Sequence, residues 1–247
     1  MLKILTDNAP DVSPETPFGC RIASAAATYG QSGPFEQFWV QDGGTVLAKI
    51  DDIALIEEKD GMDAEEVLAF LRTLDVKKFS CSEETAKHLG LAPSAWGEIM
   101  VLHAQNHKEE AYADVRFDPS PREIYSVLKQ SETNTFRVPE FEPFYMDLSY
   151  RTRHGAALSA GVYQGARLVS CAVCTAMTER AAVISAVACV PGLRRHGYGR
   201  TAVNALAGRL KRENIYIFRA EGENEEFYRS LGFESYGRWV EVDFQNT

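Results

Sequence analysis

The chain has 247 residues, of which 45% are hydrophobic and 25% charged, and its formal net charge is −9. These proportions are ordinary for a globular protein, and the length suits one large domain or two small ones. The acidic balance argues against a nucleic acid or another polyanion as the main partner. No apolar run is long enough to span a membrane, and the first residues lack a signal-peptide profile. We therefore expect a cytoplasmic protein without a membrane partner.

The cysteines and histidines do not form a recognisable metal or disulfide pattern. Five scattered cysteines are too few for a disulfide framework. Cys171 and Cys174 have the spacing of a redox or zinc motif, but they lie in a strand-like run where residues three apart point to opposite faces. His103 and His107 are four apart, yet no glutamate accompanies them in a zincin arrangement. We expect core packing for the two cysteines and no metal site.

The first half of the chain alternates strand and helix patterns. In order, the pattern predicts a helix over 21–29, strands over 35–41, 45–50 and 53–57, a helix over 63–74, a strand over 76–81, a helix over 82–90 and a strand over 98–104. Gly43 and Gly44 indicate a hairpin turn. Prolines at 119 and 121 then punctuate the chain, and we predict two domains, 1–115 and 116–247.

The second half begins with a capping box made by Ser120 and Glu123. A second helix is expected over 143–153, and it overlaps a segment, 136–150, that is rich in aromatic and acidic residues. Three consecutive strands follow at 156–163, 168–177 and 181–190, then a helix from about Gly199, a strand at 215–218, a helix at 224–231 and a strand pair around 233–244. This order predicts an α+β fold, a central mixed sheet flanked by helices.

A short internal similarity suggests two similar halves. Residues 82–91 align with residues 224–233 without gaps, and both stretches follow a strand and predict a helix that ends in glycine. Chance similarity over ten residues is the alternative. Where the second half has a basic glycine loop, the first has an acidic stretch over 57–65, which would repel a pyrophosphate. If the halves are related, we expect only the second to bind the anion.

That basic loop is the strongest local signal in the chain. Gly197 and Gly199 leave room for close approach, Arg194, Arg195 and Arg200 add positive charge, and a helix begins directly afterwards. The unpaired N–H groups at a helix start favour an anion. The loop therefore predicts a phosphate or pyrophosphate site, with a plain basic turn as the alternative.

Arg194-x-x-Gly197-x-Gly199, followed some thirty residues later by Phe227-Tyr228 and Gly232-Phe233, resembles the GNAT N-acetyltransferase superfamily, and the resemblance extends in element order over 120–245. It implies acetyl-CoA or a related acyl-CoA as co-substrate, and a degenerate GNAT-like first half. The residues that it implies for CoA binding are Val187 and Cys189 on the pantetheine arm, Arg194, Arg195, His196, Gly197, Tyr198, Gly199 and Arg200 on the pyrophosphate, and Asn224. It also implies Tyr228 as proton donor to the departing thiolate. A core role for Tyr228 and a helix cap for Asn224 are the alternatives.

Two positions depart from the family pattern. The strand 181–190 has no carboxylate where some members carry a glutamate base, and Ser185 is its only polar residue. A base could come from Glu140, Glu142 or Asp147, act through water, or be unnecessary for a neutral amine. Glu221 stands where members often have asparagine.

The resemblance implies an enzyme that transfers an acetyl group to a primary amine of a small molecule or peptide by direct attack. We expect the acceptor between the 136–150 segment and the C-terminal strands. The alternatives are a non-catalytic acyl-CoA-binding protein and a dinucleotide-dependent oxidoreductase. The latter rests on Gly197-x-Gly199-x-x-Ala202, although about six residues separate this fingerprint from its strand. Monomer and homodimer both stay open.

Overall fold

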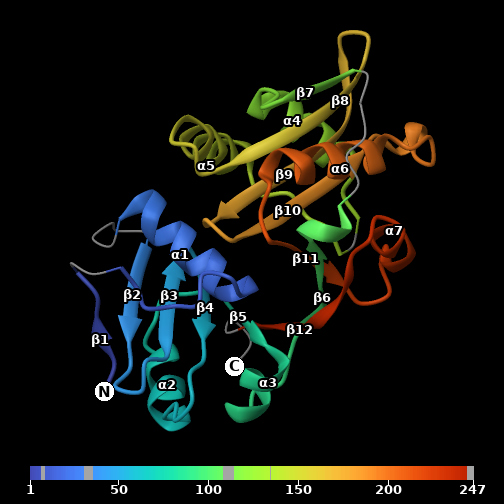
Figure 1. Ribbon diagram of the computed structural model, residues 1–247. Helices are drawn as coiled ribbons and strands as arrows, with labels where there is room; N and C mark the ends of the chain where they lie inside the picture. The colour runs from blue at the N-terminus through green and yellow to red at the C-terminus, as the bar shows by residue number, and fades with distance from the viewer. Residues whose placement is uncertain (7–8, 31–35, 108–113, 134, 244–247) are drawn as a thin grey trace. The chain divides into compact units, whose positions relative to one another are not determined.

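The computed structural model describes residues 1–6, 9–30, 36–107, 114–133 and 135–243 (Figure 1). The predicted strand ends at residues 35 and 244 lie outside these ranges. The chain divides into two compact units. The first unit consists of residues 1–99, 218–223 and 235–247, and the second of residues 100–217 and 224–234.

The first unit is built on a mixed sheet. Its strands, in hydrogen-bonded order, are β1 (Lys3–Ile4), β2 (Glu36–Val40), β3 (Val46–Ile50), β4 (Ile53–Glu57), β5 (Lys78–Ser82) and β12 (Glu234–Asp243). Only β4 and β5 are parallel; the other neighbours in this series are antiparallel. The core clusters alternate along β3: Val46 and Ala48 pack with residues of helix α1 (Pro17–Tyr29), whereas Leu47 packs with helix α2 (Ala64–Leu71). The helices therefore cover opposite faces of this sheet.

The end of the described chain differs from the predicted strand pair. Residues 234–243 form one continuous strand, β12, and residues 239–243 of it pair with β5. Val240 and Val242 are buried in the same cluster as α2. A strand that is distant in sequence therefore belongs to the first unit and completes its sheet.

The second unit contains an antiparallel meander. Its strands β7 (Val115–Phe117), β8 (Leu158–Gln164), β9 (Arg167–Met177) and β10 (Ala181–Cys189) pair in sequence, and β11 (Asn214–Ala220) then pairs parallel to β10. Helices α4 (Pro121–Gln130) and α5 (Phe141–Arg153) belong to the cluster on one face, and α6 (Tyr198–Leu210) covers the other (Figure 1). The remaining elements are β6 (Ala95–His103), α3 (Glu83–His88), α7 (Glu225–Arg229) and the short 3₁₀ turns η1 (Ala104–Asn106) and η2 (Pro191–Leu193).

Two local predictions for this unit are confirmed. Ser120 and Glu123 form the capping box of α4, with Glu123 N–H donating to Ser120 Oγ at 3.3 Å and Ser120 N–H donating to Glu123 Oε2 at 3.2 Å. Cys171 packs in the cluster under α4, and Cys174 packs in the cluster under α6. The two thiols lie on opposite faces, as strand geometry requires.

The two ten-residue segments that are similar in sequence, 82–91 and 224–233, are also similar in structure. The helices α3 and α7 each follow a strand that is parallel to its predecessor, β5 after β4 and β11 after β10. Each ends in a glycine of positive φ, 63° at Gly90 and 91° at Gly232. The closing hydrogen bonds also correspond: Leu91 N–H donates to Ala86 O at 3.0 Å, and Phe233 N–H donates to Tyr228 O at 3.1 Å. The two halves share one pattern, and alanine occupies in the first half the position of Tyr228.

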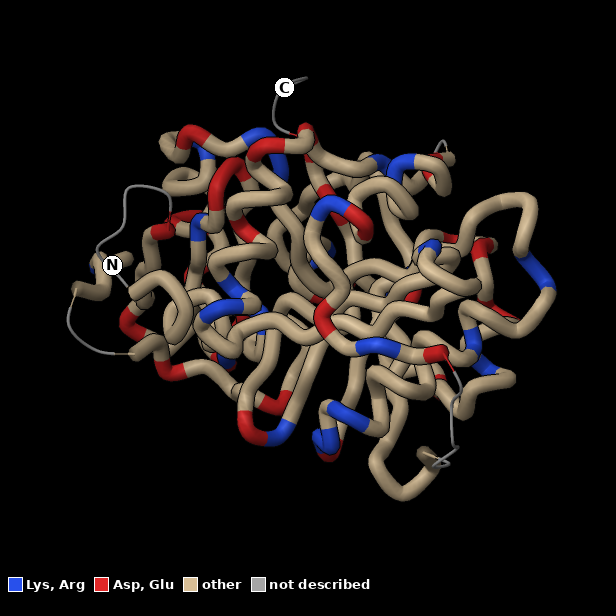
Figure 2. The backbone as a smooth tube through the Cα atoms, turned by 90° about the horizontal axis from the view of Figure 1, so that it is seen from above, with Lys and Arg blue, Asp and Glu red and all other residues tan. Residues whose placement is uncertain are grey.

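Charges of both signs alternate along the backbone in Figure 2, with acidic segments more frequent. Among the described residues no helix is long and apolar enough to cross a membrane.

Candidate active site

On the side away from β9, strand β10 pairs with β11 over only part of its length. Pairing with β11 covers residues 181–184 and ends at Ile184, whereas pairing with β9 continues to Cys189. Val190 N–H donates to Val169 O at 3.0 Å, so in this antiparallel register residues 188 and 190 direct their backbone groups toward β9. Val187 and Cys189 therefore direct theirs the other way, toward the edge that β11 has left. An extended ligand that carries amide groups can pair with a strand edge of this kind.

One backbone group on that edge is already engaged. Cys189 O accepts hydrogen bonds from Ser131 Oγ at 3.1 Å and from Arg194 Nε at 3.3 Å. The Arg194 side chain thus bonds to the last residue of β10, the strand that precedes its loop. Burial raises the pKa of the Cys189 thiol, which disfavours the reactive thiolate.

A double bulge lies where β10 separates from β11. The register with β9 shifts between Val183 and Ile184 and again between Ile184 and Ala186, which leaves Thr175 and Ser185 without a directly opposite residue. Their hydroxyls are hydrogen-bonded to each other. A bulge places two successive residues on one side, and both Ser185 and Ala186 line the same pocket. The sequence showed Ser185 as the only polar residue of this strand but gave no sign of the bulge.

The loop after β10 leaves the first turn of α6 open. Gly197 is the N-cap, with φ of 86°, and α6 has neither a side-chain cap nor an acidic residue in its first turn. Arg195 is also left-handed, with φ of 65°, and the loop from Arg194 to Gly197 is exposed. A Cβ at Gly199 would make only an ordinary contact with Phe227, 3.5 Å away. The first N–H groups of α6 are therefore accessible to an anion.

The side chains of the loop residues predicted to bind CoA have different partners. His196 Nδ1 lies 2.9 Å from Arg194 O, and the His196 and Tyr198 rings stack at 6.2 Å between centroids. Arg200 is directed to the end of α7, where its guanidinium donates to Ser230 O at 3.0 Å and to Ser230 Oγ at 2.8 Å. The charge of Arg200 lies near the start of α6, and its guanidinium group links α6 to α7.

Tyr228 and Asn224 lie at either end of the short helix α7. Tyr228 is half-buried between Phe227 and Phe233, with ring centroids 4.9 and 5.7 Å away, and burial raises the pKa of its phenol to about 12. The phenol is protonated at neutral pH. Asn224 precedes α7 in the left-handed conformation, with φ of 55°, and its side chain makes no capping hydrogen bond. The side-chain cap considered for Asn224 from the sequence is therefore wrong.

A pocket of about 230 Å³, which we call the α5 pocket, adjoins the bulge. Its walls come from α4, α5, the segment between them and strands β9 and β10. The lining residues are Leu128, Phe136, Arg137, Val138, Pro139, Phe144, Asp147, Leu148, Val173, Thr175, Ser185 and Ala186. The aromatic and acidic segment 136–150 thus contributes one wall, and the opposite wall consists of β9 and β10 and not of the C-terminal strands.

Of the three carboxylates considered as bases, Asp147 alone lines this pocket. Arg151 Nε donates to both carboxylate oxygens of Asp147, at 2.9 and 3.1 Å, and Arg151 Nη1 donates to Thr175 O at 2.7 Å. The buried Arg151 therefore ties α5 to the bulged part of β9. Arg151 has no recognisable sequence signal, since its partner Thr175 is distant in the chain.

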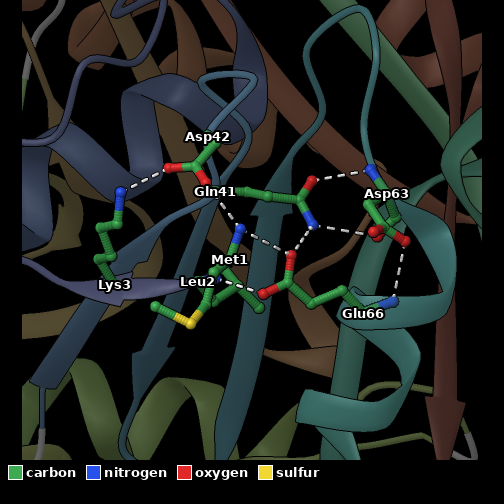
Figure 3. Close-up of polar contacts among 7 residues, drawn as sticks. All are labelled: Met1, Leu2, Lys3, Gln41, Asp42, Asp63 and Glu66. Atoms are coloured by element: carbon green, nitrogen blue, oxygen red, sulfur yellow. Dashed lines mark hydrogen bonds and ion pairs between the residues drawn. The ribbon is translucent and has the colours of Figure 1, made fainter.

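The first unit closes the equivalent helix start with its own residues. Asp63 caps α2, accepting from Glu66 N–H at 3.1 Å, and Gln41 Nε2 donates to Glu66 Oε2 at 2.8 Å (Figure 3). Gln41 Oε1 also accepts from Asp63 N–H at 2.8 Å. At the end of β4 the Glu57 carboxylate accepts from Ser13 N–H at 3.0 Å. The α2 start thus presents carboxylates, whereas the α6 start presents open N–H groups.

These features define the class of protein. A meander, an open strand edge, an uncapped glycine-started helix and a following parallel strand form the acyl-CoA N-acyltransferase fold. Residues 122–233 match the model of the acetyltransferase (GNAT) family, so this segment is a GNAT domain and the resemblance seen in the sequence is confirmed. A search of curated protein sequences gave no match.

Solved structures share the fold over most of the chain. A tandem GNAT protein from the clavulanic acid biosynthesis pathway aligns with a TM-score of 0.62 and 15% identity, covering 98% of this chain and 97% of that one. A GCN5-related N-acetyltransferase from Kribbella flavida aligns at 0.58 and 17%, covering 83% and 88%. A GNAT-family acetyltransferase from Colwellia psychrerythraea aligns at 0.58 and 11%, covering 99% of both chains. The mixed α/β fold with two similar halves is therefore established, and the antiparallel meander before β10 excludes the dinucleotide-binding alternative.

Proposed function

We propose that the protein is an N-acetyltransferase that uses acetyl-CoA and acetylates a primary amine. The observation that carries the proposal is the open edge of β10, because the backbone of Val187 and Cys189 faces it and it leads directly to the uncapped start of α6. An extended amide-containing arm with a pyrophosphate at one end matches this combination of strand edge and anion site.

Acetyl-CoA supplies an activated acyl thioester when it is bound. Val187 would pair with the pantetheine amides, and the N–H groups that follow Gly197 would hold the pyrophosphate, with Arg194, Arg195 and Arg200 adding positive charge and His196, Tyr198 and Gly199 shaping the loop. Asn224, exposed and without a capping bond, is placed to bond the arm. Cys189 contributes its N–H, since its carbonyl already accepts two bonds.

The acceptor enters through the α5 pocket, which reaches the bulge at Ser185. The neutral amine nitrogen forms the new C–N bond as the C–S bond breaks, so the amine loses a proton and the departing thiolate gains one. Tyr228 serves as hydrogen-bond and proton donor to that sulfur. A phenol with a pKa of about 12 is a weak acid, so most of the rate enhancement comes from positioning the two reactants.

The test is a melting curve with and without acetyl-CoA, with NADH as a control ligand. A ligand at a hundredfold its Kd stabilises the folded state by about 2.7 kcal/mol. We expect a shift with acetyl-CoA alone, lost in Gly197→Glu. The matched control is Gly165→Glu, which also has a positive φ, 63°, with open space around it, but lies in the β8–β9 turn. Equal binding by wild type and Gly197→Glu contradicts the proposed site.

Turnover is measured separately, as thiol release in the presence of amines. Acetyl-CoA binding without thiol release for any amine class would instead favour the alternative of an acyl-CoA-binding protein that lacks catalysis.

A further inference from the structure

The α5 pocket also limits the acceptor, if the proposed function holds. A cavity of about 150 Å³ is enough for a benzene molecule. At about 230 Å³ the pocket has room for one ring or one branched side chain together with a few polar atoms. The pocket itself therefore has room for a single residue of the acceptor.

The walls of the pocket are mainly apolar. Phe136, Phe144 and Leu148 come from the segment around α5, and Val173 and Ala186 come from the sheet. Burial of apolar surface there contributes roughly 25 cal/mol per Å². The occupant therefore has an apolar body.

Two charged residues, Arg137 and Asp147, line the pocket. Asp147 accepts two hydrogen bonds from Arg151, which compensates its charge. Arg137 is exposed and lines the pocket. The pKa of the nearby Glu132 is lowered mainly by Lys129, whose Nζ lies 2.8 Å from its carboxylate, then by the hydrogen bond from Val138 N–H at 2.9 Å, and least by Arg137. An acceptor that carries a carboxylate complements Arg137, whereas a simple amine does not.

The hydroxyl pair of Thr175 and Ser185 lies at the bulge, on the side of the pocket formed by the sheet. Hydroxyls can accept a hydrogen bond from an amine N–H and can leave its lone pair directed elsewhere. A polar contact for the amine therefore lies at the point where the pairing of β10 with β11 ends.

We infer that the acceptor is a free α-amino acid with an apolar side chain, its carboxylate at Arg137, its side chain among Phe136 and Phe144, and its amine at the Ser185–Thr175 hydroxyl pair. The reaction forms an N-acetyl amino acid and free CoA thiol. One proton leaves the α-ammonium group for solvent water before attack, and the second, lost from the amine as the C–N bond forms, balances the proton taken up by the thiolate.

The test compares amines that differ only in the carboxylate. The pairs are L-phenylalanine with 2-phenylethylamine and L-leucine with 3-methylbutylamine, each assayed by thiol release with acetyl-CoA. We expect kcat/KM to be at least tenfold higher for each amino acid. Arg137→Gln should lower kcat/KM for the amino acids by about tenfold and leave the decarboxylated amines unchanged. Arg153→Gln, an exposed arginine outside the pocket lining, is the control.

The outcomes separate the two proposals. Equal or faster turnover of the decarboxylated amines, or turnover confined to peptides, overturns the amino-acid inference and leaves the acetyltransferase intact. If acetyl-CoA produces no melting shift and no amine releases thiol, the proposed function fails first. Unchanged amino-acid turnover in Arg137→Gln also overturns the inference.

Discussion

At the scale of single residues, we propose the Tyr228 phenol as the proton donor to the departing sulfur. Because burial raises its pKa to about 12, the phenol stays protonated across the pH range of ordinary assays. We expect kcat of the wild type to show no fall from this group between pH 7 and 10. Tyr228→Phe should lower kcat by about 10²-fold, the contribution typical of a positioned proton donor, while the Kd for acetyl-CoA stays the same. An unchanged kcat would remove Tyr228 from the mechanism.

The raised pKa of Tyr228 also makes the free energy of unfolding depend on pH. Below pH 10 both folded and unfolded chains hold the phenolic proton. Between about pH 10 and 12 the unfolded chain loses it first, so the free energy of unfolding falls as the pH rises through this window. Chemical denaturation at pH 9 and 11 should show a smaller loss in Tyr228→Phe than in the wild type. An equal loss in both would mean that the phenol titrates alike in the two states.

A buried ion pair in the first unit leads to a third prediction at this scale. Arg219 Nε donates to Glu98 Oε2 at 2.8 Å, and both side chains are largely buried. Removing one partner leaves a buried charge uncompensated, so Arg219→Met should lower the free energy of unfolding by about 3–5 kcal/mol. The control is Arg229→Gln, which breaks the exposed pair with Glu225 and should leave the melting temperature nearly unchanged. Similar melting temperatures for both variants would contradict this account.

At the scale of elements, β12 is a test of the first unit. Val240 is 2% exposed and packs in the cluster with α2. Val240→Ala should cost about 2 kcal/mol through lost burial and the cavity that remains. Hydrogen exchange should show loosened amides in β5, its partner strand. Protection in β5 that does not change would mean that the strand pairing contributes little.

Element order could be predicted from the sequence to a large extent, and the reasons are local. The capping box at Ser120, the glycines that end α3 and α7, and the basic start of α6 are signals within a few residues of the structure they specify. The pairing of β12 with β5 joins residues about 160 positions apart, and no local pattern encodes it. For the same reason the bulge at Ser185 and the link from Arg151 to Thr175 had to be seen in the structure. The loop before α6 was thus predictable from local sequence, whereas the α5 pocket was not.

At the scale of the whole molecule, the two halves share a pattern and differ at the helix start that we propose as the CoA site of the second half. The α6 start is uncapped, and the α2 start is closed by Asp63 and surrounded by Glu65 and Glu66. We expect isothermal titration with acetyl-CoA to give one site per chain, and Gly197→Glu to abolish all binding. A second site that survives this substitution would show that the first unit also binds the nucleotide.

The pairing of β12 with β5 also bears on how the protein is made on the ribosome. Residues 1–82 emerge early, but the first sheet acquires its last strand only after residues 235–243 have been synthesised. At 5–20 residues per second this delay is roughly 10–30 s, during which the edge of β5 has no β12 to cover it. An exposed strand edge is a template for pairing with other chains. The half that is translated first is therefore the last to be finished, and its nascent form is the one that a chaperone would need to protect.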